Sequence, residues 1–150
     1  MNVPGADWPD PSELGPRTGP RSRKGLEPRV PPHNIEAEAS LLGAMLLTRD
    51  AIADALEVVR AEHFYKPSHA HVFDAVCGLY AAGEPADPVT VAEALARAAL
   101  LDAIGGPGTL LELQATTPAT SSAAKYARII QEHATLRSLI GAADEIAEIG

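Results

Sequence analysis

The sequence contains few cysteines, which cross-link small domains, and few aromatic residues, which often fill their cores. It has a single cysteine, Cys77, and only six aromatic residues among 150. One cysteine excludes an internal disulfide and a cysteine-based zinc site, and it favours a reducing, cytoplasmic setting. Since 46% of the residues are hydrophobic, the chain can still bury a core, which must consist mainly of aliphatic and alanine side chains.

Lysines and long apolar runs are also scarce. The three lysines are Lys24, Lys66 and Lys125, and none follows a glycine and precedes Ser or Thr. The P-loop that binds nucleotide phosphates therefore has no counterpart, and the glycine-rich GGPG at 105–108 predicts a turn with positive φ. No run approaches the roughly 20 apolar residues of a membrane span, and no secretory signal is expected.

Charge is distributed unevenly along the chain. Residues 1–33 carry five basic and four acidic groups, whereas residues 34–150 carry seven basic and sixteen acidic groups, a net charge of −9. A field of this sign repels nucleic-acid phosphates. We therefore do not expect the main part of the chain to bind DNA through a basic surface.

Composition divides the chain into three segments. Residues 1–32 hold eight of the thirteen prolines and bury too little apolar surface to fold, so we predict a disordered tail. Residues 33–118 predict a globular helical body, and residues 119–150 predict one long helix. No stretch alternates with a period of two, so the fold class is all-α, a compact bundle of about five to six helices followed by a long one.

The body should contain helices at about 34–47, 50–59, 68–82, 88–98 and 108–115. Asn34 should cap the first, with Glu36 and Glu38 in its first turn, where the helix dipole favours anions. Apolar residues at helical spacing predict the buried faces. These residues are Ile35, Leu42, Met45, Leu46, Ile52, Leu56, Val59, Val72, Phe73, Val76, Leu79, Tyr80, Val91, Leu95, Ala98, Leu110, Leu111 and Leu113.

Nothing in the chain predicts an active site. His69 and His71 form an H-x-H pair near His63, but residues i and i+2 of a helix lie about 200° apart and cannot share a face. We favour one histidine at the start of a helix and one that is packed or capping. The carboxylates look scattered over solvated surfaces, and we expect no catalytic, cofactor or metal site in this segment.

The last helix is too long for the body that precedes it. Thirty helical residues span about 45 Å, whereas a body of about 85 residues has a radius of gyration of only about 12 Å. Its apolar residues cover about 200° of the helix, more than one packing partner demands. We predict an assembly or partner interface made of Tyr126, Ile129, His133, Leu136, Leu139, Ile140, Ala143 and Ile146, with Ile130 and Ala147 on the same stripe.

The order of five segments resembles a known family. These segments are PPHNIEAEASLLGAML, FYKPSHAHVFDAV, GEPADPVTVAEAL, LLDAIGG and YARIIQEHATLRSLIGAADEIA. Together they resemble the N-terminal domain of the bacterial replicative DNA helicase of the DnaB type over about residues 31–150. One departure is Thr109, where the family often has an aromatic residue, so a partner contact made by that residue is not implied here.

The resemblance implies a non-catalytic scaffold. In the family the last helix begins a helical hairpin, and the domains pair as dimers within a homohexameric collar that docks primase and, in some cases, a helicase loader. ATP hydrolysis with Mg²⁺ and most DNA contacts belong to a motor domain, which this segment lacks. Two alternatives remain: a stand-alone helical dimerisation or adaptor module of a regulatory protein, and a small metal-dependent enzyme that uses His69 and His71.

Overall fold

The computed structural model describes residues 30–149, with side chains up to residue 147, and from Pro32 onward the chain forms one compact unit. The tail expected at 1–32 lies, up to residue 29, outside the described residues. Within the described part all regular structure is helical, which confirms the all-α class. The elements are α3 (Ile35–Leu47), α4 (Arg49–Leu56), η2 (Ala61–His63), α5 (Pro67–Ala81), α6 (Pro88–Arg97), η3 (Asp102–Ile104), α7 (Pro107–Ala115), η4 (Thr120–Ser122) and α8 (Ala123–Ile149).

Local signals set most helix starts. The Asn34 side chain accepts a hydrogen bond from the Ala37 N–H at 2.9 Å and caps α3, as expected. Asp87 caps α6 by accepting from the Thr90 N–H, and this bond lowers the pKa of Asp87. Helix α5 begins at Pro67 rather than Ser68, because a proline with no N–H to satisfy suits the first helical turn.

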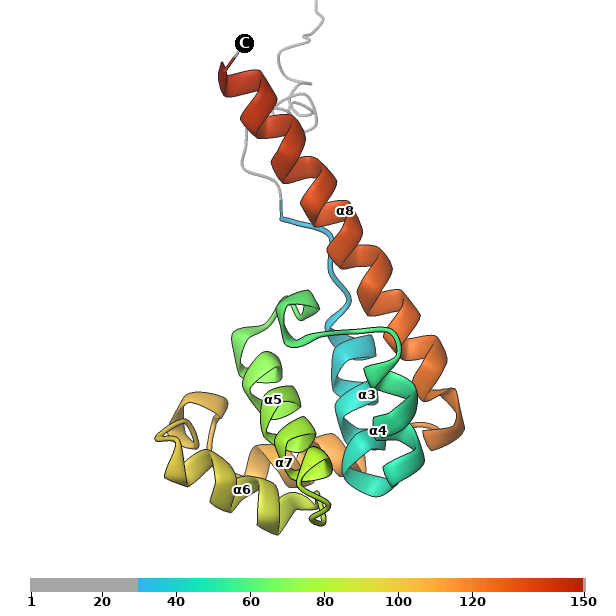
Figure 1. Ribbon diagram of the computed structural model, residues 1–150, viewed down its shortest axis with the longest axis vertical. Helices are drawn as coiled ribbons and strands as arrows, with labels where there is room; N and C mark the ends of the chain where they lie inside the picture. The colour runs from blue at the N-terminus through green and yellow to red at the C-terminus, as the bar shows by residue number, and fades with distance from the viewer. Residues whose placement is uncertain (1–29, 150) are drawn as a thin grey trace, which may run out of the picture. The chain divides into compact units, whose positions relative to one another are not determined.

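Helix α3 lies at the centre of the bundle. It packs against α4, α5, α7 and α8 (Figure 1), and every residue from Leu41 to Leu46 is buried. The predicted core residues Phe73, Val76 and Leu79 of α5 are also buried. Three expected inward positions were wrong, because Ile35, Ala98 and Leu111 are exposed; two of them lie at a helix end, where the neighbouring elements no longer cover the side chain.

Gly43 and the Gly105–Gly106 pair require glycine for different reasons. A Cβ on Gly43 of α3 would overlap the carbonyl group of Leu113 and the hydroxyl of Thr117, so glycine allows α3 and α7 to approach closely. Gly105 and Gly106 have φ angles of 103° and 87°, which confirms the turn with positive φ predicted for this glycine-rich stretch.

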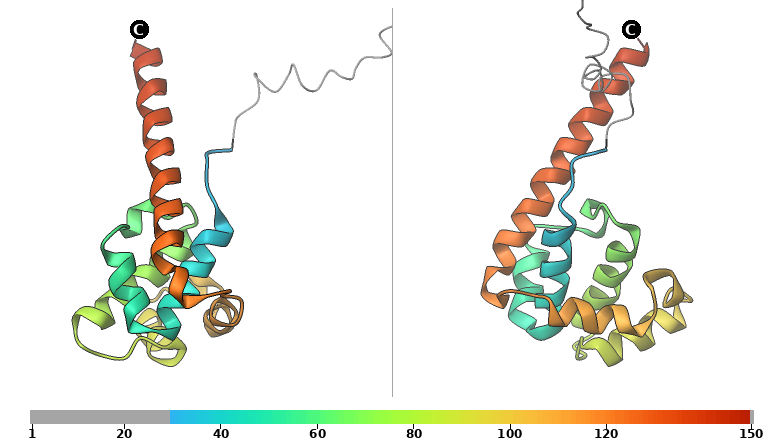
Figure 2. Two further views of the ribbon diagram at one scale, coloured as in Figure 1. Left: turned by 90° about the vertical axis from the view of Figure 1, so that its right-hand side faces the viewer. Right: turned by 180° about the vertical axis from the view of Figure 1, so that it is seen from behind.

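Helix α8 extends well beyond the helical body (Figures 1 and 2). Its first half lies against α3 and α4, and its C-terminal half continues past them without an adjacent helix in the described part. All described side chains from Ser138 to Ala147 are exposed. The body therefore supports only about half of its longest helix.

Glycine-to-alanine substitutions should distinguish the close α3–α7 contact at Gly43 from the exposed surface at Gly78. Gly43→Ala should lower the free energy of unfolding by about 1–3 kcal/mol, because its methyl group meets backbone that cannot rotate away. Gly78→Ala, in the exposed interior of α5, has nothing within 4 Å of its new Cβ and should raise stability by about 0.5–1 kcal/mol. Urea denaturation measures both changes, and an equal response of the two variants would contradict this account of the α3–α7 contact.

Candidate assembly surface

Helix α8 presents two apolar faces on different sides. The inner face consists of Ala123, Ala127, Ile130 and Ala134, which are all buried against the body. Three of these four residues are alanines, so the backbone of α8 can approach its neighbours closely. This face accounts for the contact of α8 with α3 and α4.

The second face, which we call the outer stripe, belongs to the projecting half. Successive residues turn by about 100°, which places the outer stripe within about 120° of arc and on the opposite side of α8 from the inner face. Leu139 and Ile146 expose 61% and 70% of their surface, and Leu136 and Ile140 about half. The outer stripe consists of Leu136, Leu139, Ile140, Ala143, Ile146 and Ala147.

The residues predicted for the interface divide between two environments. Leu136, Leu139, Ile140, Ala143 and Ile146 lie on the outer stripe and are exposed. Tyr126, Ile129 and His133 are half-buried at the border of the body. His133 folds back along α8, where its Nδ1 lies 2.8 Å from the Ile129 carbonyl oxygen.

An open groove adjoins the border residues. It has a volume of about 410 Å³ and lies between the start of α3, the segment before α8, and α8 itself. Tyr126 and Ile129 line it together with Asn34, Ala37 and Pro118. The apolar surface of α8 therefore continues from the projecting half onto the body.

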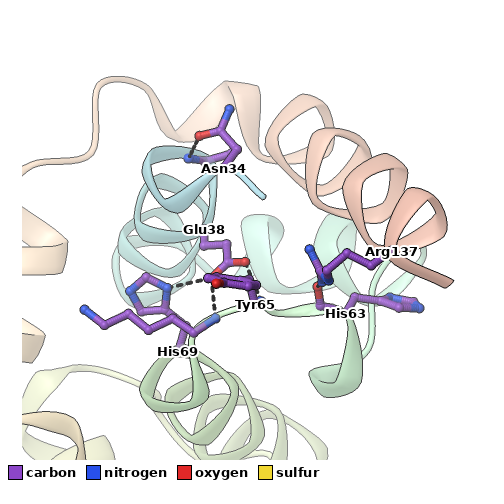
Figure 3. Close-up of polar contacts among 8 residues, drawn as sticks. Asn34, Glu38, His63, Tyr65, His69 and Arg137 are labelled. Atoms are coloured by element: carbon purple, nitrogen blue, oxygen red, sulfur yellow. Dashed lines mark hydrogen bonds and ion pairs between the residues drawn. The ribbon is translucent and has the colours of Figure 1, made fainter. Parts of the chain in front are cut away.

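A second feature near α8 is a polar cluster centred on Glu38 of α3 (Figure 3). Glu38 of α3 is 1% exposed. Its carboxylate accepts from the Tyr65 N–H at 2.6 Å and contacts the His69 Nδ1 at 2.8 Å. A third, longer bond of 3.4 Å comes from the Lys66 N–H. Since a carboxylate only accepts hydrogen bonds, the His69 Nδ1 is the donor in this contact.

This cluster links α3 to the segment that precedes α5. Tyr65 and Lys66 lie immediately before the first turn of α5, where the helix dipole also favours a negative charge. The same segment contacts α8, because Arg137 donates to the carbonyl oxygen of His63 at 2.6 Å. The Glu38 carboxylate thus fixes a segment on which the middle of α8 rests.

Glu38 corrects the expectation that every carboxylate is solvated. Sequence reasoning placed it in the first turn of α3 for its interaction with the helix dipole alone. A signal was present, because Glu38, Leu42 and Met45 share one helical face by their spacing, and that face is the core face. The partners of Glu38 lie 27 or more residues away along the chain, so no local pattern revealed them.

The described residues offer little chemistry beyond these contacts. His69 sits at the start of α5 and is engaged by Glu38, in line with the expected structural role of one histidine. No group of three potential metal ligands occurs among residues 30–149. Burial and the nearby Asp74 raise the pKa of Cys77 to about 11, so its thiol stays protonated at neutral pH. In the same part of the chain, no helix is both long and apolar enough to cross a membrane.

Removing the Glu38 carboxylate should destabilise the unit strongly. Glu38→Ala leaves the Tyr65 N–H and the His69 ring without their buried acceptor, and should lower the free energy of unfolding by about 3–5 kcal/mol. Glu38→Gln keeps the shape but turns an N–H₂ toward donors, at a cost of about 1–3 kcal/mol. Glu36→Ala, on the exposed side of the same turn, is the matched control and should change stability by less than about 1 kcal/mol. Equal urea midpoints for the Glu38 and Glu36 variants would contradict this role.

Comparison with known proteins connects this arrangement to a family. Residues 30–132 match the family described as DnaB-like helicase N terminal domain. Over 122 residues the chain is 48% identical to the replicative DNA helicase DnaB of Mycobacterium leprae. Over 125 residues it is 40% identical to the replicative DNA helicase DnaC of Bacillus subtilis. These alignments cover 81% and 83% of the chain, but only 20% and 28% of the two relatives.

Solved structures agree with the sequence comparison. The crystal structure of the N-terminal domain of DnaB helicase from Mycobacterium tuberculosis superposes with a TM-score of 0.78 at 48% identity, and the match covers 79% of this chain and 86% of that one. The N-terminal domain of DnaB helicase from Helicobacter pylori, whose structure was described with its interactions with primase, shares the fold with a TM-score of 0.62 at 20% identity; this match covers 75% of this chain and 87% of that one. The chain belongs to the family of DnaB-like helicase N-terminal domains.

Proposed function

We propose that this domain is an assembly module of a replicative DNA helicase, in which the outer stripe of α8 pairs with another copy of the chain. The pairs would join into a hexameric collar that also docks primase. Membership of the family supports the link to replication. Primase interaction in a relative with the same fold supports the choice of partner.

The exposed outer stripe is the observation that carries this proposal. Leu136, Leu139, Ala143 and Ile146 follow one another at spacings of three, four and three residues. This spacing is the seam of a helix that packs lengthwise against another helix at a crossing angle of about 20°. Since Leu139, Ala143 and Ile146 are exposed, the seam is open to a helix of another chain.

The free energy gained by burying the outer stripe limits how tightly two copies can associate through it alone. Full burial of a Leu or Ile side chain contributes about 1.5–3 kcal/mol, and the four large residues of the outer stripe are about half to two-thirds exposed. One copy would therefore contribute about 3–7 kcal/mol and a pair about 7–14 kcal/mol, whereas association costs about 4–15 kcal/mol. The outer stripe alone supports a weak dimer, and a stable collar requires further surface, such as the second hairpin helix of the family.

Catalysis is assigned to other parts of the helicase. The net charge of −9 over residues 34–150 opposes broad contact with DNA phosphates. ATP and Mg²⁺ would act in the motor domain, which would also make most DNA contacts. A helicase loader is a further candidate partner for the collar, and the protein would work at the nucleoid in the cytoplasm.

Charges on the outer stripe should weaken assembly without unfolding the domain. Converting both Ile140 and Ile146 to Asp should raise the dissociation constant for self-association at least about tenfold, which corresponds to 1.4 kcal/mol. It should also reduce retention by primase. Both positions lie beyond the body, so the helix content should hardly change. Sedimentation velocity and a primase pull-down, each with circular dichroism on the same sample, measure these effects.

Two controls separate the outer stripe from the general effect of added charge. Ser138→Asp adds a charge to the same half of α8 on the opposite side, and Leu111→Asp adds one at an exposed apolar residue of the body. Both should associate like the parent protein. If the double variant also behaves like the parent, the outer stripe is not the assembly surface.

A further inference from the structure

Arg137 marks the point at which α8 leaves the body. Ala134, three residues earlier, is buried, and Arg137 itself is half-buried. Every described side chain beyond it, from Ser138 to Ala147, is exposed. Arg137 is therefore the outermost side chain of α8, within the described part, that is held by the body.

Its guanidinium joins three groups from two distant segments. Nη1 donates to the Pro32 carbonyl oxygen at 2.7 Å, and Nη2 donates to the His63 carbonyl oxygen at 2.6 Å. The guanidinium carbon also lies 5.5 Å from the centre of the Tyr65 ring, within the range of a cation–π contact. A planar guanidinium can hold two carbonyls and a ring at once, which a lysine ammonium cannot match.

Two of the residues that Arg137 contacts make further contacts of their own. The His63 ring accepts from the Arg60 N–H at 2.9 Å, which closes the short η2 turn. The Tyr65 N–H donates to the buried Glu38, and its ring stacks on His33 at 4.0 Å with planes 7° apart. Arg137 thus contacts two residues, His63 and Tyr65, that have further contacts within the body (Figure 3).

Without Arg137, the last contacts between α8 and the body would lie nearer to the start of the helix. The inner face stops at Ala134, and the next polar attachment, from the Gln131 side chain to the Val58 carbonyl oxygen, lies six residues before Arg137. Ile146 lies nine residues beyond Arg137, or about 13 Å along the helix, so a tilt of about 10° would move it by about 2 Å. A shift of this size is enough to misalign side chains that interdigitate with a partner.

We infer that Arg137 is a positioning residue that sets the direction of the projecting half of α8 relative to the body. It thereby sets the placement of the outer stripe. That this placement matters for assembly rests on the proposed function. That Arg137 sets the direction of the projecting half does not.

Distance measurements between spin labels test this directly. In a chain with Cys77 replaced by Ser, labels at Glu112→Cys on α7 and Glu145→Cys on α8 report the direction of the projecting half; both glutamates are exposed and lie off the outer stripe. Dilution of the doubly labelled chain with an excess of unlabelled chain keeps the measured distances within one chain, whichever surface the copies use to associate. Arg137→Ala should broaden the distance distribution by about twofold, because the tilt acts over this lever arm.

Two further variants make the result decisive. Arg137→Lys, which can reach only one carbonyl, should give an intermediate width and guards against failure of the alanine variant to fold. Arg128→Ala removes an exposed arginine of the same helix and should leave the width unchanged. An unchanged distribution in folded Arg137→Ala would overturn the inference. Because the readout is a distance within one chain, it is independent of whether the outer stripe proves to be the assembly surface.

Discussion

The buried carboxylate of Glu38 connects α3 to the segment that enters α5, two parts of the domain that are distant in the sequence. Removal of a carboxylate from water costs several kcal/mol, and here two backbone N–H groups and the His69 ring replace its hydration. These partners belong to the segment that enters α5, whereas Glu38 belongs to α3. One side chain thus holds the central helix and the chain on which α8 rests in a fixed relation.

The apolar residues of α8 face in two directions, and only the first half of the helix packs against the body. The inner face secures the first half through three alanines and Ile130, and the outer stripe carries larger side chains where no body remains. Intrinsic helix propensity alone would leave such a projection marginal in water. Attachment of the first half to the body therefore supports the exposed apolar residues of the second half.

The division between body and projection supports the scaffold role proposed above. The match to the family model ends at residue 132, close to the point where α8 leaves the body. Within the body, the thiol of Cys77 is protonated at neutral pH and the ring of His69 is engaged by Glu38. The proposed assembly surface is consistent with the acidic charge of the body, which opposes contact with nucleic-acid phosphates.

The sequence by itself determined the all-α class, the helix order, the cap at Asn34, the glycine turn at Gly105 and the long last helix. These features follow from neighbours within a few residues, through propensity, capping and periodicity. Helix ends were less certain: α4 stops at Leu56, yet Val59, three residues later, is still buried.

Only the tertiary structure decided which apolar face of α8 the body uses. Ile130 and Leu136 look alike in the sequence, but one packs inward and the other is exposed. It also decided that Glu38 is buried and that Arg137 reaches Pro32, 105 residues away. These outcomes depend on groups brought together by packing, and periodicity along one segment carries no information about what another segment places opposite it.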